Sequence, residues 1–214
     1  MEKGEISRNV LLKLIEAILK EEELEEIAKI ISTDPNLTAK ILTFVNSAYY
    51  NLRREIHSVK DAIAYIGYKK LKEIAFALLL SATLKDKSKE ELLKSVQLAY
   101  LTKALSKRVF PKLNIEDDAF LVGILNQVYK IAGEELIKEL ERAHISKAVI
   151  EGLRNDSSPL GKVKILAHKL SPWCERLIKG DKNFNLPQDN VKKEIVIGSC
   201  LESQEEAQKL SEIL

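Results

Sequence analysis

The 214-residue chain has few cysteines, glycines and prolines, and no long apolar run. Two cysteines cannot build the disulfide framework of a small secreted protein, so we expect Cys174 and Cys200 to be unpaired thiols in a reducing cytoplasm. Eight glycines and five prolines are too few for a collagen-like or loop-rich chain. No apolar run approaches the roughly 20 residues of a membrane span, and the first residues lack a signal-peptide pattern. These absences predict a cytoplasmic protein without membrane contact.

The chain also lacks a strong excess of charge of either sign. It has 34 basic and 32 acidic residues, and a net charge of +2. Dedicated nucleic-acid binders carry a larger basic excess, so the balance argues against that class. Most charged residues are Lys and Glu, a bias typical of thermophile proteins. The 45% of hydrophobic residues can build the core of one ordinary domain.

What is present is a helical pattern along almost the whole chain. Apolar residues recur at spacings of three and four, and the clearest stripe contains Leu71, Ile74, Ala75, Leu78, Leu79 and Ala82. No segment alternates with the period of two that a β-strand requires. The sequence therefore predicts an all-α protein, a compact bundle of about ten helices.

Capping residues predict where several of these helices begin and end. Asp34 can cap free N–H groups, and Pro35 follows where the helix needs no N–H donor. Ser58 and Asp61 have the spacing of a capping box. Gly67 is placed to end the short helix that follows Ser58.

Breaks in the pattern predict the domain organisation. We expect one helical domain over residues 1–187, with sub-bundles at 10–84 and 90–180 separated by the break at 85–89. Residues 188–214 follow a cluster of helix breakers and are predicted to form a peripheral helical tail. We expect a second break at Gly198-Ser199, with a new helix beginning at Ser203. The last segment is too short to be helical alone, so it should dock on the 145–178 helices or, alternatively, on a partner.

The sequence contains none of the common catalytic motifs. It has no phosphate-binding loop, dinucleotide fingerprint or nucleophile elbow. Its histidines, His57, His144 and His168, lie far apart and are read as surface or loop residues. The acidic run 116–118 fits the first turn of a helix, where the dipole favours negative charge. We therefore predict no catalytic residue, no metal site and no cofactor.

One region combines basic and aromatic residues. Arg53 and Arg54 lie close to four lysines and four tyrosines, namely Lys60, Lys69, Lys70, Lys72, Tyr49, Tyr50, Tyr65 and Tyr68. Such a mixture can bind a nucleotide or a single strand. The alternative, a solvated face with core aromatics, is favoured because Glu55 and Asp61 interrupt the basic residues.

Residues 30–80 contain an ordered series of marks that resembles a known family. The marks are Asp34-Pro35, Leu37-Thr38, Ile41-Leu42, Asn46-Ser47-Ala48-Tyr49, Ile56, Ser58, Ala62-Ile63, Gly67 and Leu71. In order and spacing they resemble HDOD, the HD-related output domain, over about residues 10–84. The resemblance implies an HD-like helical bundle, and it extends more weakly over the following helices.

The departures from the catalytic relatives of that family concern the metal ligands. An HD phosphohydrolase holds its metal with a His-Asp pair and further His and Asp ligands, but here the corresponding residues are Asn126-Gln127 and the 92–110 helix has no histidine. Neutral amides do not supply the anionic field that holds a divalent ion and activates its water. The resemblance therefore implies a non-catalytic output domain of signal transduction.

Such a domain would act through a protein partner or by sensing a nucleotide second messenger. The alternatives are an HD-type metal-dependent nucleotide phosphohydrolase and a nucleic-acid-binding helical protein. Asn46-Ser47 is predicted to end a helix and to hold the 51–57 loop, as a structural latch rather than a ligand site. If a small ligand binds, we expect it at Arg53 and Arg54 with Tyr49 and Tyr50.

Overall fold

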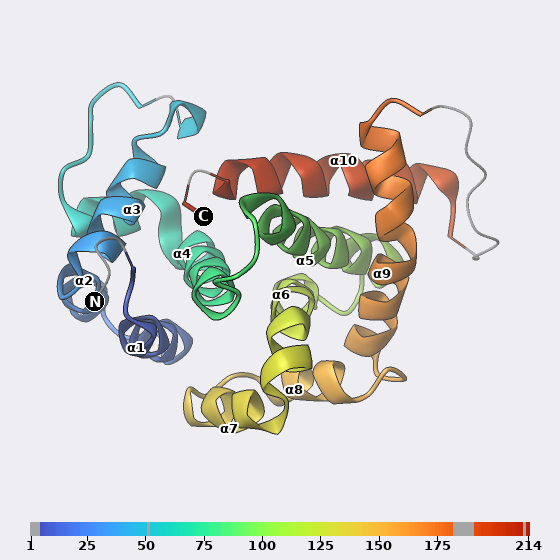
Figure 1. Ribbon diagram of the computed structural model, residues 1–214, viewed down its shortest axis with the longest axis horizontal. Coiled ribbons are helices and arrows are strands. Elements are labelled where there is room, and N and C mark those ends of the chain that lie inside the picture. Colours follow the sequence, from blue (N-terminus) through green and yellow to red (C-terminus); the bar gives the residue numbers. More distant parts are fainter. Residues whose placement is uncertain (1–4, 51, 182–190, 212) are drawn as a thin grey trace.

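A computed structural model describes residues 5–50, 52–181, 191–211 and 213–214. Within these residues the chain forms ten α-helices, one short 3-10 helix and no strand, so the predicted all-α bundle is confirmed (Figure 1). The elements are α1 (Arg8–Leu19), α2 (Leu24–Ser32), α3 (Pro35–Val45), η1 (Ala48–Tyr50), α4 (Val59–Thr83), α5 (Lys89–Val109), α6 (Glu116–Ala132), α7 (Glu134–Arg142), α8 (Lys147–Arg154), α9 (Pro159–Ile178) and α10 (Lys193–Leu210).

Two of the predicted helix starts are present as capped helix ends. The Asp34 carboxylate accepts hydrogen bonds from the N–H groups of Asn36 and Leu37, at 2.9 and 3.0 Å, and Pro35 is the first residue of α3. Ser58 accepts from the N–H of Asp61 at the start of α4. These caps satisfy N–H groups that the helices leave unpaired.

Gly67 divides α4 into two helical segments. Its backbone has φ 77° and ψ 161°, so the chain leaves the helical conformation there and resumes it in a new direction. This region of backbone space is accessible almost exclusively to glycine. A Cβ atom at Gly67 would meet nothing within 4 Å, so the backbone conformation alone requires the glycine.

Two hydrophobic cores hold the helices together. The larger core takes residues from α1 to α8 and from the C-terminal end of α10, and the smaller one lies between α5, α9 and α10. Because α6 packs on α4 as well as on α5, the larger core continues across the break at residues 85–89.

The C-terminal helix differs from its prediction in two respects. α10 runs without interruption through Gly198 and Ser199, so the predicted second break is wrong. Ser203 lies inside the helix, where its hydroxyl donates to the Cys200 carbonyl at 2.8 Å instead of capping a new helix. α10 packs on α5 and α9 and crosses from α9 towards the end of the molecule that contains α3 (Figure 1). Its contacts with the α9 core come from the residues up to Cys200, whereas Ala207, Leu210 and Ile213 are buried in the larger core. The prediction that the last segment docks on the 145–178 helices is therefore wrong.

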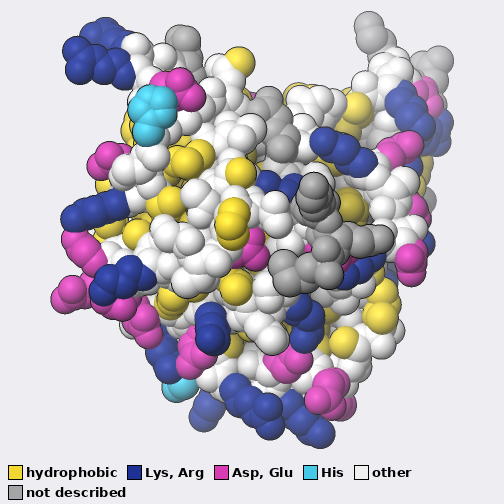
Figure 2. All heavy atoms as spheres, turned by 60° about the vertical axis from the view of Figure 1, so that its left-hand side comes forward, with side chains coloured by type: hydrophobic (Ala, Val, Ile, Leu, Met, Phe, Trp, Pro, Cys, Tyr) yellow, Lys and Arg dark blue, Asp and Glu magenta, His cyan; other side chains and the backbone are white. Residues whose placement is uncertain are grey.

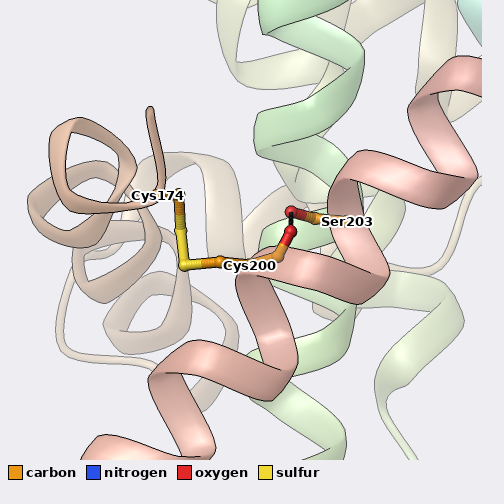
Figure 3. The surroundings of a disulfide bond; sticks show 3 residues. All are labelled: Cys174, Cys200 and Ser203. Atoms are coloured by element: carbon orange, nitrogen blue, oxygen red, sulfur yellow. Dashed lines mark hydrogen bonds between the residues drawn. A yellow bond between two sulfur atoms is a disulfide. The ribbon is translucent and has the colours of Figure 1, made fainter. Parts of the chain in front are cut away.

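A disulfide joins Cys174 in α9 to Cys200 in α10 (Figure 3). The prediction of unpaired thiols is therefore wrong. The sequence separation of 26 residues gives no signal of pairing, but the packing of α10 on α9 brings the two Cα atoms to 5.1 Å, which is within the usual range for a disulfide. Both cysteines are buried in the smaller core.

None of the helices in the described part of the chain is long and apolar enough to cross a membrane.

Candidate functional site

Three tyrosine rings form a contiguous cluster at the end of α3. The 3-10 helix η1 places the rings of Tyr49 and Tyr50 edge to face, with 5.2 Å between their centroids, and Tyr65 of α4 lies 5.7 Å from Tyr50. Tyr49 and Tyr65 are about half exposed, at 49% and 50%. Burial raises the pKa of Tyr50 to about 12. We call Tyr49, Tyr50 and Tyr65 the tyrosine surface.

The amide of Asn46 ties the loop that follows η1 back to α3. Its Oδ1 accepts from the N–H of Ile56 at 2.8 Å, and its Nδ2 donates to the Ile56 carbonyl at 2.7 Å. Both polar atoms of the side chain are therefore engaged by the backbone of one residue. A hollow beside this contact is lined in part by Asn46, Ser47, Glu55 and His57.

Arg53 and Arg54 are exposed on this loop and lie outside the lining of that hollow. Of the four residues that the sequence proposed for ligand binding, the structure brings Tyr49 and Tyr50 into contact and places the arginines on the segment that follows them. Seen from one side, hydrophobic side chains lie in the middle of the molecule, with charged side chains around them (Figure 2).

A buried carboxylate organises a second polar cluster, between α4 and α5. Glu73 is only 4% exposed. Its carboxylate accepts from the Tyr100 hydroxyl and the Lys70 ammonium, both at 2.7 Å, and from Lys103 at 2.5 Å. Burial, followed by the charge of Glu73, raises the pKa of Tyr100 well above its ordinary value. A buried carboxylate needs partners of this kind, and here every partner comes from α4 or α5.

The C-terminal helix connects this cluster to the tyrosine surface. Glu206 of α10 accepts from Lys70 at 2.9 Å and pairs with Lys209. The ammonium of Lys209 lies 4.4 Å from the centroid of the Tyr49 ring, which is a cation–π contact. Burial lowers the pKa of Lys209, but hydrogen bonds to Glu206, Tyr49 and Glu205 outweigh this effect and the pKa is raised.

α6 contributes one acidic residue to the same region. Asp117 pairs with Lys69 at 2.9 Å and lies 3.5 Å from Lys103. Burial opposes ionisation of Asp117, but these lysines outweigh it and lower the pKa of the carboxyl group. Asp117 therefore serves as an ion-pair partner as well as a first-turn residue of α6.

A cleft lies between α4, α5 and α10, and the sequence did not predict it. It is lined by Ile66, Lys69, Lys70, Glu73, Tyr100, Lys103, Glu202 and Glu206. The one available signal was the pair of Lys70 and Glu73, three residues apart at the start of a strongly apolar stripe. A charge at a buried position of such a stripe calls for a partner on a neighbouring helix.

Asn126, which is read at the place of the HD metal pair, contacts a histidine of another helix. Asn126 of α6 is 6% exposed, and its Nδ2 lies 2.9 Å from Nε2 of His168 in α9. The sequence placed His168 on a surface or loop, whereas it is half-buried inside a helix. Burial, then Lys130 and Lys164, lower the pKa of His168, which favours the neutral ring that can accept from Asn126.

These residues do not form a metal site of the usual kind. In the described ranges, no three side chains of His, Cys, Asp or Glu are grouped so that they could hold an ion. An amide and a single neutral imidazole do not match the carboxylate-rich ligand sets of hydrolytic metal centres.

Comparison with known proteins gives one family and one distant relative. The chain is 26% identical over 136 residues to the cyclic di-GMP phosphodiesterase CdgJ of Vibrio cholerae serotype O1 (strain ATCC 39315 / El Tor Inaba N16961). This alignment covers 63% of the chain but only 31% of that protein. No solved structure matches the chain significantly. The model of the HDOD domain matches residues 7–157, from the start of α1 to the end of α8. The resemblance seen in the sequence is thus confirmed, and the chain belongs to the HDOD domain family.

Proposed function

We propose that this HDOD domain is a non-catalytic output module of a signalling pathway and acts by binding a protein partner. The observation that carries the proposal is the contact between Asn126 and His168. Asn126, read at the place of the HD metal pair, hydrogen-bonds to His168 of another helix and is neutral at every pH. A hydrolase of the HD type would need anionic ligands at this place.

The relative's name supports a signalling context without assigning its activity to this chain. CdgJ is named a phosphodiesterase of cyclic di-GMP. Because the aligned segment is less than a third of that protein, its named activity does not carry over to this chain. We take from it only the signalling context.

The tyrosine surface is the favoured contact area for the partner. Tyrosine is enriched at the energetically dominant positions of protein interfaces, because its ring buries a large area and loses little conformational entropy. Tyr49 and Tyr65 present half of their surface to solvent, and Arg53 and Arg54 follow in the adjacent loop. Arginine is the charged residue most enriched at such positions.

A test of the non-catalytic assignment measures hydrolysis and metal content together. We expect the purified chain to hydrolyse neither bis-p-nitrophenyl phosphate nor cyclic di-GMP in the presence of Mn²⁺ or Mg²⁺. Elemental analysis should find no stoichiometric transition metal. Hydrolysis that a chelator abolishes, and that His168→Ala also removes, would show that the chain is an HD-type phosphohydrolase.

A test of partner binding compares substitutions on and off the tyrosine surface. A partner is first recovered by crosslinking in the source cells. We expect it to bind Tyr49→Ala and Tyr65→Ala at least tenfold more weakly than it binds the wild-type chain. Tyr129→Ala is the matched control, because Tyr129 lies on α6 and bonds to Glu134. Equal affinities for all three variants would remove the tyrosine surface from the interface.

A nucleotide second messenger is the second candidate ligand for the same surface. The observation in its favour is the proximity in sequence of half-exposed tyrosine rings and two exposed arginines. Rings of this kind stack on bases, and guanidinium groups pair with phosphates. Titration calorimetry with cyclic di-GMP should then show binding that the Arg53→Ala/Arg54→Ala variant loses. Absence of heat with the wild-type chain at millimolar nucleotide would leave the protein partner as the only candidate of the two.

A further inference from the structure

The disulfide divides α10 into two parts that are held in different ways. Up to Cys200, the helix is bonded covalently to α9 and packs in the smaller core. After Cys200 it has no covalent tie and reaches the larger core. We call the described residues from 201 onwards, 201–211 with 213 and 214, the C-terminal arm. The arm lies beyond the family match, which ends at residue 157.

Three buried apolar side chains anchor the arm. Its buried apolar side chains are Ala207, Leu210 and Ile213, and Ser203 is the other buried residue of its contact face. A helix of this length does not persist alone in water. Segments with few buried apolar contacts open locally at a lower free energy than the rest of a domain. The arm is therefore the part of α10 that can leave its place while Cys200 stays fixed.

The arm also makes polar contacts with basic groups of the domain. Glu206 pairs with Lys70 at 2.9 Å, and Glu202 pairs with Arg108 at 2.6 Å. Lys40 of α3 donates to the Ile213 carbonyl at 2.5 Å. The arm thus places two carboxylates, four residues apart, on cations that belong to α4 and α5.

Opening of the arm would uncover a basic groove with an apolar wall. Lys70 would keep Glu73 as its partner, but Glu73 is shared with Lys103, and Asp117 is shared between Lys69 and Lys103, so these three lysines have two carboxylates among them. Arg108 would lose its ion pair with Glu202. The apolar positions now filled by Leu210, one helical turn after Glu206, and by Ile213 would open to solvent. A groove with this charge attracts an acidic ligand.

We propose that this groove is an interaction surface for an acidic amphipathic helix of a partner protein, and that the C-terminal arm is the chain's own occupant of it. The arm itself shows the pattern that fits: two acidic residues four apart, next to apolar residues spaced by three. Helices with this arrangement bind grooves through their apolar face, and their charges set specificity. The inference rests on the proposed role in partner binding, and it names the chemistry of the partner.

The contact between Lys209 and Tyr49 couples this groove to the tyrosine surface. While the arm is docked, the Lys209 ammonium lies on the Tyr49 ring. A helix that displaces the arm removes this cation and gives Tyr49 a new environment. Partner binding in the groove and the loss of the Lys209 contact at Tyr49 are then one event.

The first test is hydrogen exchange on the full-length, disulfide-bonded chain. We expect the amides of residues 205–210 to exchange at least tenfold faster than those of residues 197–200 in the same helix, with the α5 amides slower than both. Equal protection along α10 would overturn the proposal, because the arm would then open only with the whole domain.

The second test uses a synthetic peptide with the sequence of residues 201–214 as a fluorescent probe. It should bind Leu210→Ala/Ile213→Ala, whose own arm is loosened, at least tenfold more tightly than it binds the wild-type chain. Leu201→Ala is the matched control, because Leu201 lies on the same helix with 53% of its surface exposed. A peptide carrying Glu202→Lys and Glu206→Lys should bind at least tenfold more weakly. Equal binding by all three chains, or by both peptides, contradicts the proposal.

Two further outcomes separate this inference from related ones. If the wild-type chain dimerises at micromolar concentration and Glu206→Lys abolishes the dimer, the occupant is a second copy of the chain, and the partner version is overturned. If Tyr49→Ala and Tyr65→Ala do not change the affinity for a partner while the peptide binds as expected, the proposal that the partner binds the tyrosine surface is overturned. The proposal for the groove is then supported. If Leu210→Ala/Ile213→Ala does not fold, the hydrogen-exchange rates of the wild-type chain alone test whether the arm opens locally.

Discussion

Lys70 and Glu206 form an ion pair of 2.9 Å between α4 and α10, although 136 residues separate them in the sequence. The same ammonium group donates to Glu73 at 2.7 Å. Lys70 therefore connects a buried carboxylate to the helix that closes the cleft. The integrity of this connection depends on Glu73, which also compensates Lys103.

We predict that Glu73→Ala destabilises the domain strongly. The substitution leaves two ammonium groups and the Tyr100 hydroxyl without their common acceptor in a largely buried place. Breaking a buried pair on one side typically costs about 3 kcal/mol. Urea unfolding followed by circular dichroism measures the change. Glu90→Ala, which breaks an exposed pair with Lys94, is the control and should have no measurable effect. If Glu73→Ala lowers the free energy of unfolding by no more than Glu90→Ala does, the role assigned to Glu73 is contradicted.

Two glycine substitutions should have opposite effects on thermal stability. Gly67→Ala forces a side chain into a backbone conformation with φ 77° and should cost about 1–3 kcal/mol. Gly198→Ala lies in a regular part of α10, where the new Cβ would meet the Arg108 guanidinium at an ordinary 3.6 Å. It should stabilise the chain by about 0.5–1 kcal/mol. Scanning calorimetry on the two variants measures whether stability falls for Gly67→Ala and rises for Gly198→Ala. Unchanged stability of Gly67→Ala would show that the kink in α4 relaxes.

The stability of the domain should fall in mild acid because of His168. Its pKa in the folded chain lies below the ordinary 6.5, so the unfolded chain binds the proton more readily. Stability linked to this residue is complete above pH 6.5 and is lost as the pH falls from there towards the folded pKa. Protonation of Nε2 also removes the acceptor for Asn126.

Urea unfolding of the wild-type chain and its variants at pH 7.5 and pH 5.5 measures how much stability is lost through protonation of His168. The loss of stability between the two pH values should be smaller in His168→Gln than in the wild-type chain. His57→Gln, in the exposed loop, should behave as wild type. Identical pH dependence of all three chains would show that His168 titrates freely.

Removal of the disulfide should destabilise the chain without changing its fold. The Cys174–Cys200 bond closes a loop of 26 residues, and such a constraint on the unfolded chain contributes roughly 3 kcal/mol. We expect this loss for Cys174→Ser/Cys200→Ser in guanidinium unfolding, and a similar one for the wild-type chain in dithiothreitol. The double variant serves as its own control, because dithiothreitol should leave it unchanged. An equal response of both chains to dithiothreitol would exclude the disulfide as the cause.

The sequence predicted those features that depend on neighbouring residues. The apolar period of α4 and the cap at Asp34 are local, because a helix stripe and a capped turn involve residues within a few positions of one another. The cluster around Glu73 and the pairing of Cys174 with Cys200 depend on which helices meet. Nothing in the residues next to Glu73 or Cys200 specifies that partner helix. The continuous course of α10 through Gly198 was missed for the same reason, since packing on α5 outweighs the low helix propensity of glycine.

The double hydrogen bond between Asn46 and Ile56 brings together the two ends of the segment that carries Arg53 and Arg54. Between Asn46 and Ile56, Tyr50 and Leu52 pack against the larger core, whereas Arg53 and Arg54 are exposed. The two arginines can therefore change without displacing α3 or α4. Evolution, or an engineer, can thus exchange them for other recognition residues on the same framework, provided that Asn46 is kept.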